Sequence, residues 1–189
     1  IYSIPVGSLD KLRDTRKKRK GNALITASRL ATEKHIDWII EAVVKARLTI
    51  RDLTLDIYGE GGEGTYLNTL INEKGASQYI RLMGQKDLEE IYKSYPTYIS
   101  GSTSEGFGLT LMEAVGSGLG MIGFDVRYGN PTFIKEGENG YLLPYEKNNM
   151  KANIDQLYQA ILRTFRDKQT RDQKDFRNQS YEIAQPYLT

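Results

Sequence analysis

The sequence predicts an α/β fold: a Rossmann-like parallel sheet of about six strands with helices on both faces. Two observations lead to this prediction. Short apolar runs alternate with amphipathic runs along the chain, as expected of strand–helix units. The 189 residues are also enough for one domain with a sizeable core. We therefore expect residues 1–189 to form a single domain.

Six apolar runs have the length of strands. The first is Ala-Leu-Ile-Thr, and the second ends at a glycine-rich segment that begins with Gly59. The predicted strands are residues 23–26, 53–58, 80–83, 98–99, 121–124 and 141–143. In a parallel sheet their carboxyl ends share one edge, where ligands bind in folds of this type.

Amphipathic segments between these runs predict helices. Gly75 provides a C-cap for one of them, and Pro96 ends another. The predicted helices are residues 35–48, 66–74, 88–95, 109–117, 148–165 and 172–184.

The amino-acid composition excludes several classes of function. With 26 basic and 24 acidic residues, bulk charge does not indicate nucleic acid or an anionic membrane as a partner. The absence of cysteine excludes disulfides, thiolate zinc sites and cysteine nucleophiles. No apolar run approaches the roughly 20 residues that span a bilayer.

The two ends of the chain suggest a piece of a longer protein. The sequence starts without methionine or a signal-peptide pattern, and its last residues end abruptly. Residues 1–21 form a basic lead-in segment, and we interpret its run of Arg and Lys at 16–20 as a solvated loop. A nucleic-acid patch is the weaker alternative, because no aromatic residues interleave with the run.

The segment 102–114 carries the clearest functional pattern. Glu105 and Glu113 lie eight positions apart, with a glycine-rich turn and a helix start between them. The unpaired amides of such a turn attract a phosphate, whereas carboxylates suit sugar and ribose hydroxyls. The pattern favours a nucleotide-sugar site. Two alternatives are solvated acids at a helix start and the acid/base pair of a glycoside hydrolase; the anion-binding turn disfavours the second.

Two further features follow predicted strands. Arg29 and Lys34 flank the first strand–helix turn, where two cations could hold a diphosphate, although an ordinary exposed pair would look the same. The glycines from Gly59 to Gly62 would let a ligand approach the backbone, unless the segment is a plain loop. His35, the single histidine, is interpreted as structural. The residues offer no metal-ligand cluster, since there is no second histidine and no Asp-x-Asp pair after a strand.

Together these residues resemble the nucleotide-sugar-binding half of a GT-B glycosyltransferase of the retaining family-4 type. The matching segments are residues 4–7, 28–34, 55–61, 104–114 and 138–142. His35 and Gly120 depart from the pattern, which often has glycine after the lysine and proline before the fifth strand.

The resemblance implies a role for each candidate. Arg29 and Lys34 would bind the diphosphate, Glu105 the hydroxyls of the donor sugar and Glu113 those of the ribose. The remaining donor contacts would come from the amide turn and from residues near the base and phosphates. These are Gly106, Phe107, Gly108, Leu109 and Thr110, with Gly59, Met83 and Gln85. The family works without a bound metal, so we expect no cofactor.

A narrower resemblance, over residues 102–113 and 123–134, is to the accessory-Sec branch of this family. It implies transfer of N-acetylglucosamine from UDP-GlcNAc to Ser/Thr of serine-rich repeat adhesins, with a partner subunit. It also implies a cytoplasmic location, peripheral at the membrane through the full complex, and a missing N-terminal lobe to which a helix in 168–189 would cross back. Wall teichoic acid glycosyltransferases using UDP-glucose or UDP-GlcNAc are the nearest alternative. A non-catalytic nucleotide-binding or subunit-interaction module is another. A dehydrogenase is disfavoured because the first strand lacks the glycine fingerprint.

Overall fold

The computed structural model describes residues 19–104, 108–127, 129–166 and 172–187. Within these residues, six parallel strands form one sheet in the order β3-β2-β1-β4-β5-β6. The strands are β1 Ala23–Ala27, β2 Thr54–Tyr58, β3 Ile80–Gly84, β4 Thr97–Ile99, β5 Gly120–Phe124 and β6 Gly140–Leu143. This confirms the predicted fold class. The strand order reverses between β1 and β4, which creates a topological switch point there.

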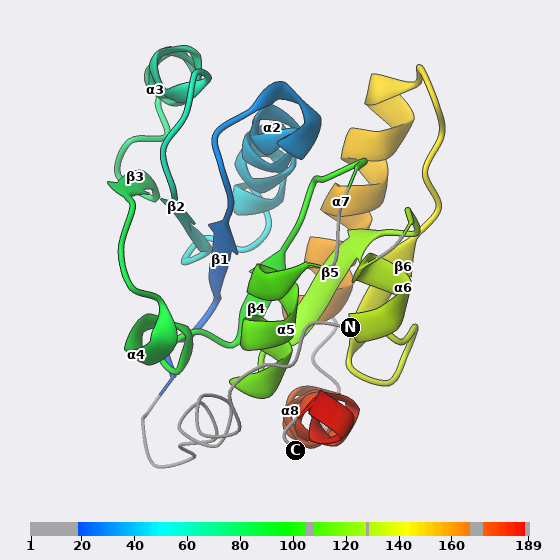
Figure 1. Ribbon diagram of the computed structural model, residues 1–189. Helices are drawn as coiled ribbons and strands as arrows, with labels where there is room; N and C mark the ends of the chain where they lie inside the picture. The colour runs from blue at the N-terminus through cyan, green and yellow to red at the C-terminus, as the bar shows by residue number, and fades with distance from the viewer. Residues whose placement is uncertain (1–18, 105–107, 128, 167–171, 188–189) are drawn as a thin grey trace.

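Helices cover both faces of the sheet (Figure 1). On one face lie α2 Ile36–Arg47, α3 Gly64–Glu73 and α7 Met150–Phe165; on the other lie α4 Glu89–Tyr92, α5 Leu109–Gly116, α6 Gly129–Phe133 and α8 Asp172–Ala184. Two short 3₁₀ turns, η1 Thr32–Lys34 and η2 Gln185–Tyr187, complete the elements.

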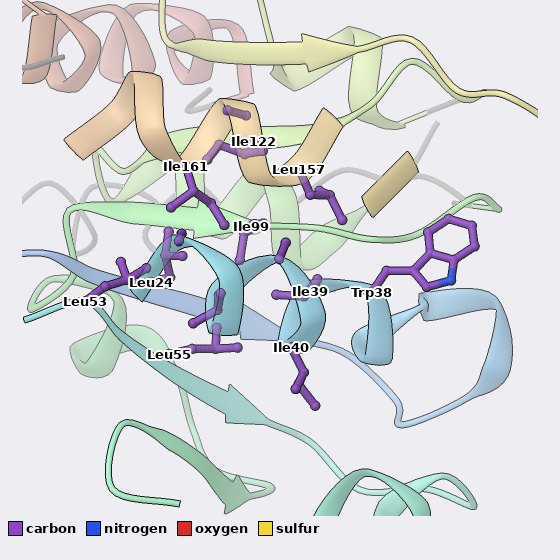
Figure 2. Packing of buried hydrophobic residues seen from close by; sticks show 14 of the residues in the cluster. Leu24, Trp38, Ile39, Ile40, Leu53, Leu55, Ile99, Ile122, Leu157 and Ile161 are labelled. Carbon is purple, nitrogen blue, oxygen red and sulfur yellow. The ribbon is translucent and has the colours of Figure 1, made fainter. Parts of the chain in front are cut away.

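The core on the α2 side explains why the alternating pattern folds this way. Ile39 and Ile40 of α2 are fully buried, as are Leu157 and Ile161 of α7. Figure 2 shows these side chains against the sheet residues Leu24, Leu55, Ile99 and Ile122. Burying each such side chain stabilises the fold by about 1.5–3 kcal/mol. The same packing fixes where α2 begins, and therefore where the β1–α2 loop lies.

One predicted helix is shorter in the structure, and one observed helix was not predicted. The helix expected at 88–95 is only Glu89–Tyr92, because Pro96 disfavours helical geometry in the preceding residue. Tyr95 instead turns inward, is 1% exposed and donates a hydrogen bond to Asp56. Helix α6 was not predicted. Its five residues include glycine and proline, which are poor helix formers, and its Asn130 Nδ2 donates to the Phe124 carbonyl at 2.8 Å.

The interpretation of the basic run as a solvated loop is wrong for Arg19. Arg19 donates to the carbonyls of Tyr95 (2.5 Å) and Ser117 (2.6 Å), and burial lowers its pKa to about 10. Lys20 is exposed, but its Nζ lies 3.6 Å from the Asp56 carboxylate. Residues 16–18 lie outside the described part of the chain.

Helix α8 packs on this domain. Ser180 donates to the Leu119 carbonyl at 2.6 Å, and a Cβ added at Gly118 would lie 2.5 Å from the Tyr181 ring. The crossing of segment 168–189 to another lobe stays a prediction. In the described part of the chain, none of the helices combines the length and the apolar character needed to cross a bilayer.

Candidate functional site

An open hollow of about 250 Å³ lies at the carboxyl ends of β1, β2 and β3. Its lining includes four residues predicted for the donor site: Arg29, Gly59, Gln85 and Thr110. They come from four different loops or helix starts, which the parallel sheet brings to one edge. The hollow is beside the switch point between β1 and β4, where ligands bind in open α/β sheets. The predicted residues Lys34, Met83, Gly108, Leu109 and Glu113 are outside this lining.

Backbone hydrogen bonds join the strand ends that form the floor of this hollow. The Ser28 N–H donates to the Tyr58 carbonyl at 3.1 Å, and the Gly59 N–H donates to the Gly84 carbonyl at 2.9 Å. Gly59 has φ +130°, and a Cβ there would lie 1.8 Å from the Ser28 carbonyl oxygen. The close approach of two protein segments therefore requires glycine at 59, whereas the sequence left a ligand's approach and a plain loop as its two explanations.

Arg29 is an accessible cation at the rim. Its side chain is 77% exposed, and Nη2 lies 3.1 Å from Oε1 of Glu33, an ion pair within the same loop. Exposed pairs of this kind contribute at most about 1 kcal/mol, so a doubly charged diphosphate could displace Glu33. Lys34, at the end of η1, is half-buried, and its backbone N–H donates to the Ala31 carbonyl at 3.0 Å.

The loop after β4 contacts the loop after β1 directly. The Thr103 N–H donates to the Glu33 carbonyl at 3.2 Å, and Thr103 Oγ1 lies 3.0 Å from His35 Nε2. A Cβ at Gly101 would come within 2.7 Å of the His35 carbonyl oxygen. The segment that leads toward Glu105 is thus at the same edge of the sheet as the loop that carries Arg29 and Lys34. Glu105, Gly106 and Phe107 themselves lie outside the described residues.

Helix α5 presents its N-terminus at this edge. Gly108 is the N-cap, with a left-handed φ of 75°, and Met112 makes the first helical hydrogen bond, to the Gly108 carbonyl. The amides of Leu109 to Leu111 precede that bond, so the helix itself offers them no acceptor, and such amides attract anions. Leu109 is 56% exposed at the helix start, and Met83 packs partly buried against the α5 side of the core.

Glu113 follows Thr110 by three positions, so the two side chains share one side of α5. Glu113 is half-buried. Burial raises its pKa, and the nearby carboxylates Asp87 and Glu89 raise it further. These neighbours belong to the segment after β3, so Glu113 lies on the side of α5 that faces this segment.

Sequence reasoning missed one cationic residue that lines the hollow. Lys86 lines the hollow as a further cation, and the signal was a basic residue directly after the Gly84-Gln85 strand end. The interpretation of His35 as structural agrees with its contact to Thr103 of the β4 loop. Burial lowers the pKa of the His35 ring, which favours its neutral form, while Asp37 and Glu33 act in the opposite direction.

Comparison with known families agrees with this geometry. A model described as "Glycosyl transferases group 1" matches residues 9–182. The chain belongs to this family. The predicted resemblance to glycosyltransferases is therefore confirmed, and the sheet is the Rossmann-like half of a GT-B fold.

Individual relatives of this group 1 glycosyltransferase chain are similar over its whole length. It is 57% identical over 190 residues to the UDP-N-acetylglucosamine–peptide N-acetylglucosaminyltransferase GtfA subunit of Limosilactobacillus reuteri. That alignment covers 100% of this chain and 36% of the relative. The chain thus spans about a third of the length of that protein.

Two solved structures have the same fold. The pneumococcal O-GlcNAc transferase GtfA in complex with UDP and GlcNAc matches with a TM-score of 0.91 and 48% identity. A GtfA/B complex matches with a TM-score of 0.89 and 54% identity. Each match covers 98% of this chain and 36% of the solved chain.

Proposed function

We propose that this domain binds UDP-GlcNAc in the full-length protein and presents N-acetylglucosamine for transfer, with retention, to Ser/Thr of a serine-rich repeat adhesin. One observation carries the proposal: Arg29, Gly59, Gln85 and Thr110 line a single hollow at the switch point of the sheet. The relatives support the choice of donor, because the similar GtfA subunits are named for UDP-N-acetylglucosamine and peptide.

The proposed chemistry needs charge stabilisation of a leaving diphosphate. When the bond between sugar and diphosphate breaks, negative charge develops on the phosphate oxygens, and fixed cations stabilise that charge. Arg29 and Lys34 lie on one loop at this edge, and Lys86 adds a cation to the hollow. We propose that these side chains take the part that a metal plays elsewhere, so no cofactor is required.

The acids complete the proposed site. The Glu113 carboxylate, on the same side of α5 as Thr110, would accept hydrogen bonds from ribose hydroxyls. Glu105 would hold the donor-sugar hydroxyls, as the family resemblance implies.

The acceptor and partners belong to the proposal as well. A serine-rich adhesin, an N-terminal lobe and a GtfB-like subunit would complete the enzyme, with a cytoplasmic location. The support for the partner is that a structure matching this domain is a GtfA/B complex.

A substitution of Arg29 tests the proposal. In the full-length protein with its partner, Arg29→Ala should reduce N-acetylglucosamine transfer by about 10- to 100-fold, because charge-assisted hydrogen bonds contribute about 1.5–3 kcal/mol. Lys45→Ala is the matched control, since Lys45 also forms an exposed ion pair, with Asp155 on the α2 surface. A lost complex with residual turnover would instead favour the non-catalytic interaction module.

Titrating the same full-length protein with UDP-GlcNAc and with UDP-glucose tests the proposed identity of the donor sugar. Tighter binding of UDP-GlcNAc agrees with the proposal. Preference for UDP-glucose, with transfer to polyol phosphate, would support the wall teichoic acid alternative and contradict it.

A further inference from the structure

His35 has an unusual backbone conformation at the junction of η1 and α2. Its φ of 45° and ψ of 46° are left-handed, and it is both the C-cap of η1 and the N-cap of α2. Non-glycine residues are uncommon in this conformation, and such conformations persist where surrounding contacts impose them. His35 directly follows Lys34, so any contact that holds it also fixes the end of the cation-bearing loop.

The imidazole is held from two sides. On one side it stacks on Trp38, with ring centroids 3.6 Å apart and planes at 14°. Trp38 is itself 7% exposed and meets Phe124 edge-on at 6.0 Å. Figure 2 shows Trp38 at the N-terminal end of α2. The ring of His35 therefore rests on the core at the carboxyl end of β5.

On its other side the ring meets the β4 loop. Nε2 lies 3.0 Å from Thr103 Oγ1, a side-chain contact between residues 68 positions apart. A threonine hydroxyl can donate or accept, so the bond forms with either neutral tautomer. The backbone bond from Thr103 to Glu33 and the close approach of Gly101 to the His35 carbonyl support the same contact.

These contacts span the switch point, because the β1 loop and the β4 loop are the two walls of the crevice between β1 and β4. We propose that His35 is a positioning residue that fixes the spacing of these walls through Thr103. This rests on the proposed function. With the spacing fixed, Lys34 keeps one position relative to the leaving diphosphate; with the bond removed, that position becomes variable. The transition state carries more concentrated charge on the diphosphate than the bound ground state does. Variable placement of Lys34 should therefore weaken the stabilisation of the transition state more than the binding of the substrate.

The threonine provides the cleanest test, in the full-length enzyme with its partner. Thr103→Val removes the hydroxyl with little change in shape, whereas Thr103→Ser keeps the hydroxyl. We expect Thr103→Val to lower kcat about three- to tenfold, the effect of one neutral hydrogen bond, with KM for UDP-GlcNAc changed less than twofold. Thr103→Ser should retain most of the wild-type kcat. A merely structural role would not separate kcat from KM in this way.

A double-mutant cycle tests whether His35 and Thr103 act through each other. His35→Gly relieves the left-handed backbone and removes the ring, and the His35→Gly/Thr103→Val enzyme should be no slower than the slower single variant. Equal kcat values for Thr103→Val and Thr103→Ser would overturn the inference, as would independent effects whose fold-changes multiply in the double variant. If His35→Gly fails to fold, the threonine pair decides alone. A wild-type enzyme that binds no UDP-sugar would refute the proposed function, and the inference with it.

Discussion

Replacing Gly59 with alanine should destabilise the chain and disrupt the hollow. The added Cβ would lie 1.8 Å from the Ser28 carbonyl oxygen and 2.9 Å from its carbon. Both are backbone atoms, so no flexible side chain can move aside. Contacts below 3.0 Å force a shift, and the two segments must separate by more than 1 Å. The segments are the floor of the hollow that Arg29 lines.

The magnitude follows from two costs. Alanine at φ +130° is strained by about 1–3 kcal/mol. The separation also strains the bonds from Ser28 to Tyr58 (3.1 Å) and from Gly59 to Gly84 (2.9 Å), and losing one buried bond costs about 1–3 kcal/mol. We expect the free energy of unfolding to fall by about 2–6 kcal/mol, the sum of the two costs, and UDP affinity to fall more than about tenfold.

Urea unfolding, followed by circular dichroism, and UDP titration measure the two effects. Gly62→Ala is the matched control, because a Cβ at Gly62 has no atom within 4 Å, and that variant should differ from wild type by less than about 0.5 kcal/mol. A Gly59→Ala protein as stable as Gly62→Ala would refute the argument that backbone contact requires this glycine.

Three further substitutions test the electrostatics of the site and the sheet. Glu33→Gln should tighten UDP binding up to about fivefold, because the exposed ion pair no longer competes for Arg29; calorimetry measures this. The raised pKa of Glu113 predicts that wild-type UDP affinity falls as pH drops through that pKa, whereas Glu113→Gln should bind about tenfold more weakly at pH 7 without this additional fall. Asp56→Ala should lower the free energy of unfolding by about 2–4 kcal/mol, because Asp56 is 2% exposed and its oxygens accept from Arg81 at 3.0 and 3.1 Å; urea unfolding measures the loss.

Glu113 should also make stability depend on pH, in the direction opposite to its effect on UDP affinity. A carboxyl whose pKa is raised by folding binds its proton more tightly in the folded state, so stability falls as pH rises from 4.5 through the folded pKa. Glu113→Gln removes that fall and should be more stable than wild type at pH 7, although it binds UDP less well. Greater stability with unchanged UDP affinity would argue against a ribose contact. Unchanged affinity in Glu33→Gln would mean that Glu33 does not compete for Arg29, and an Asp56→Ala protein as stable as wild type would mean that the Arg81 bonds contribute nothing.

Local sequence pattern was sufficient for most of the fold. Strands such as β2, Thr54–Tyr58, and helices such as α7 were predictable because the spacing of apolar residues and nearby turn residues act over a few positions. The pattern was insufficient where tertiary contacts overrule propensity. Tyr95 leaves its predicted helix to reach Asp56, and α6 forms from poor helix formers because Asn130 and Phe133 are buried.

The candidate site divides in the same way. The residue types at the strand ends were readable, since parallel strands must bring Arg29, Gly59 and Gln85 to one edge. The role of Gly59 in packing and the bond from His35 to Thr103 were not readable. They depend on segments that meet only after the sheet is assembled, 31 and 68 positions apart along the chain.

The sequence by itself therefore determined most of the succession of strands and helices, the family, and which charged residues follow the strand ends. Tertiary structure alone decided that β4 lies beside β1, and thus which loops became the two walls of one crevice. The physical reason is range: hydrophobic periodicity and capping act within a few residues, whereas strand order and loop contacts are set by packing the whole core.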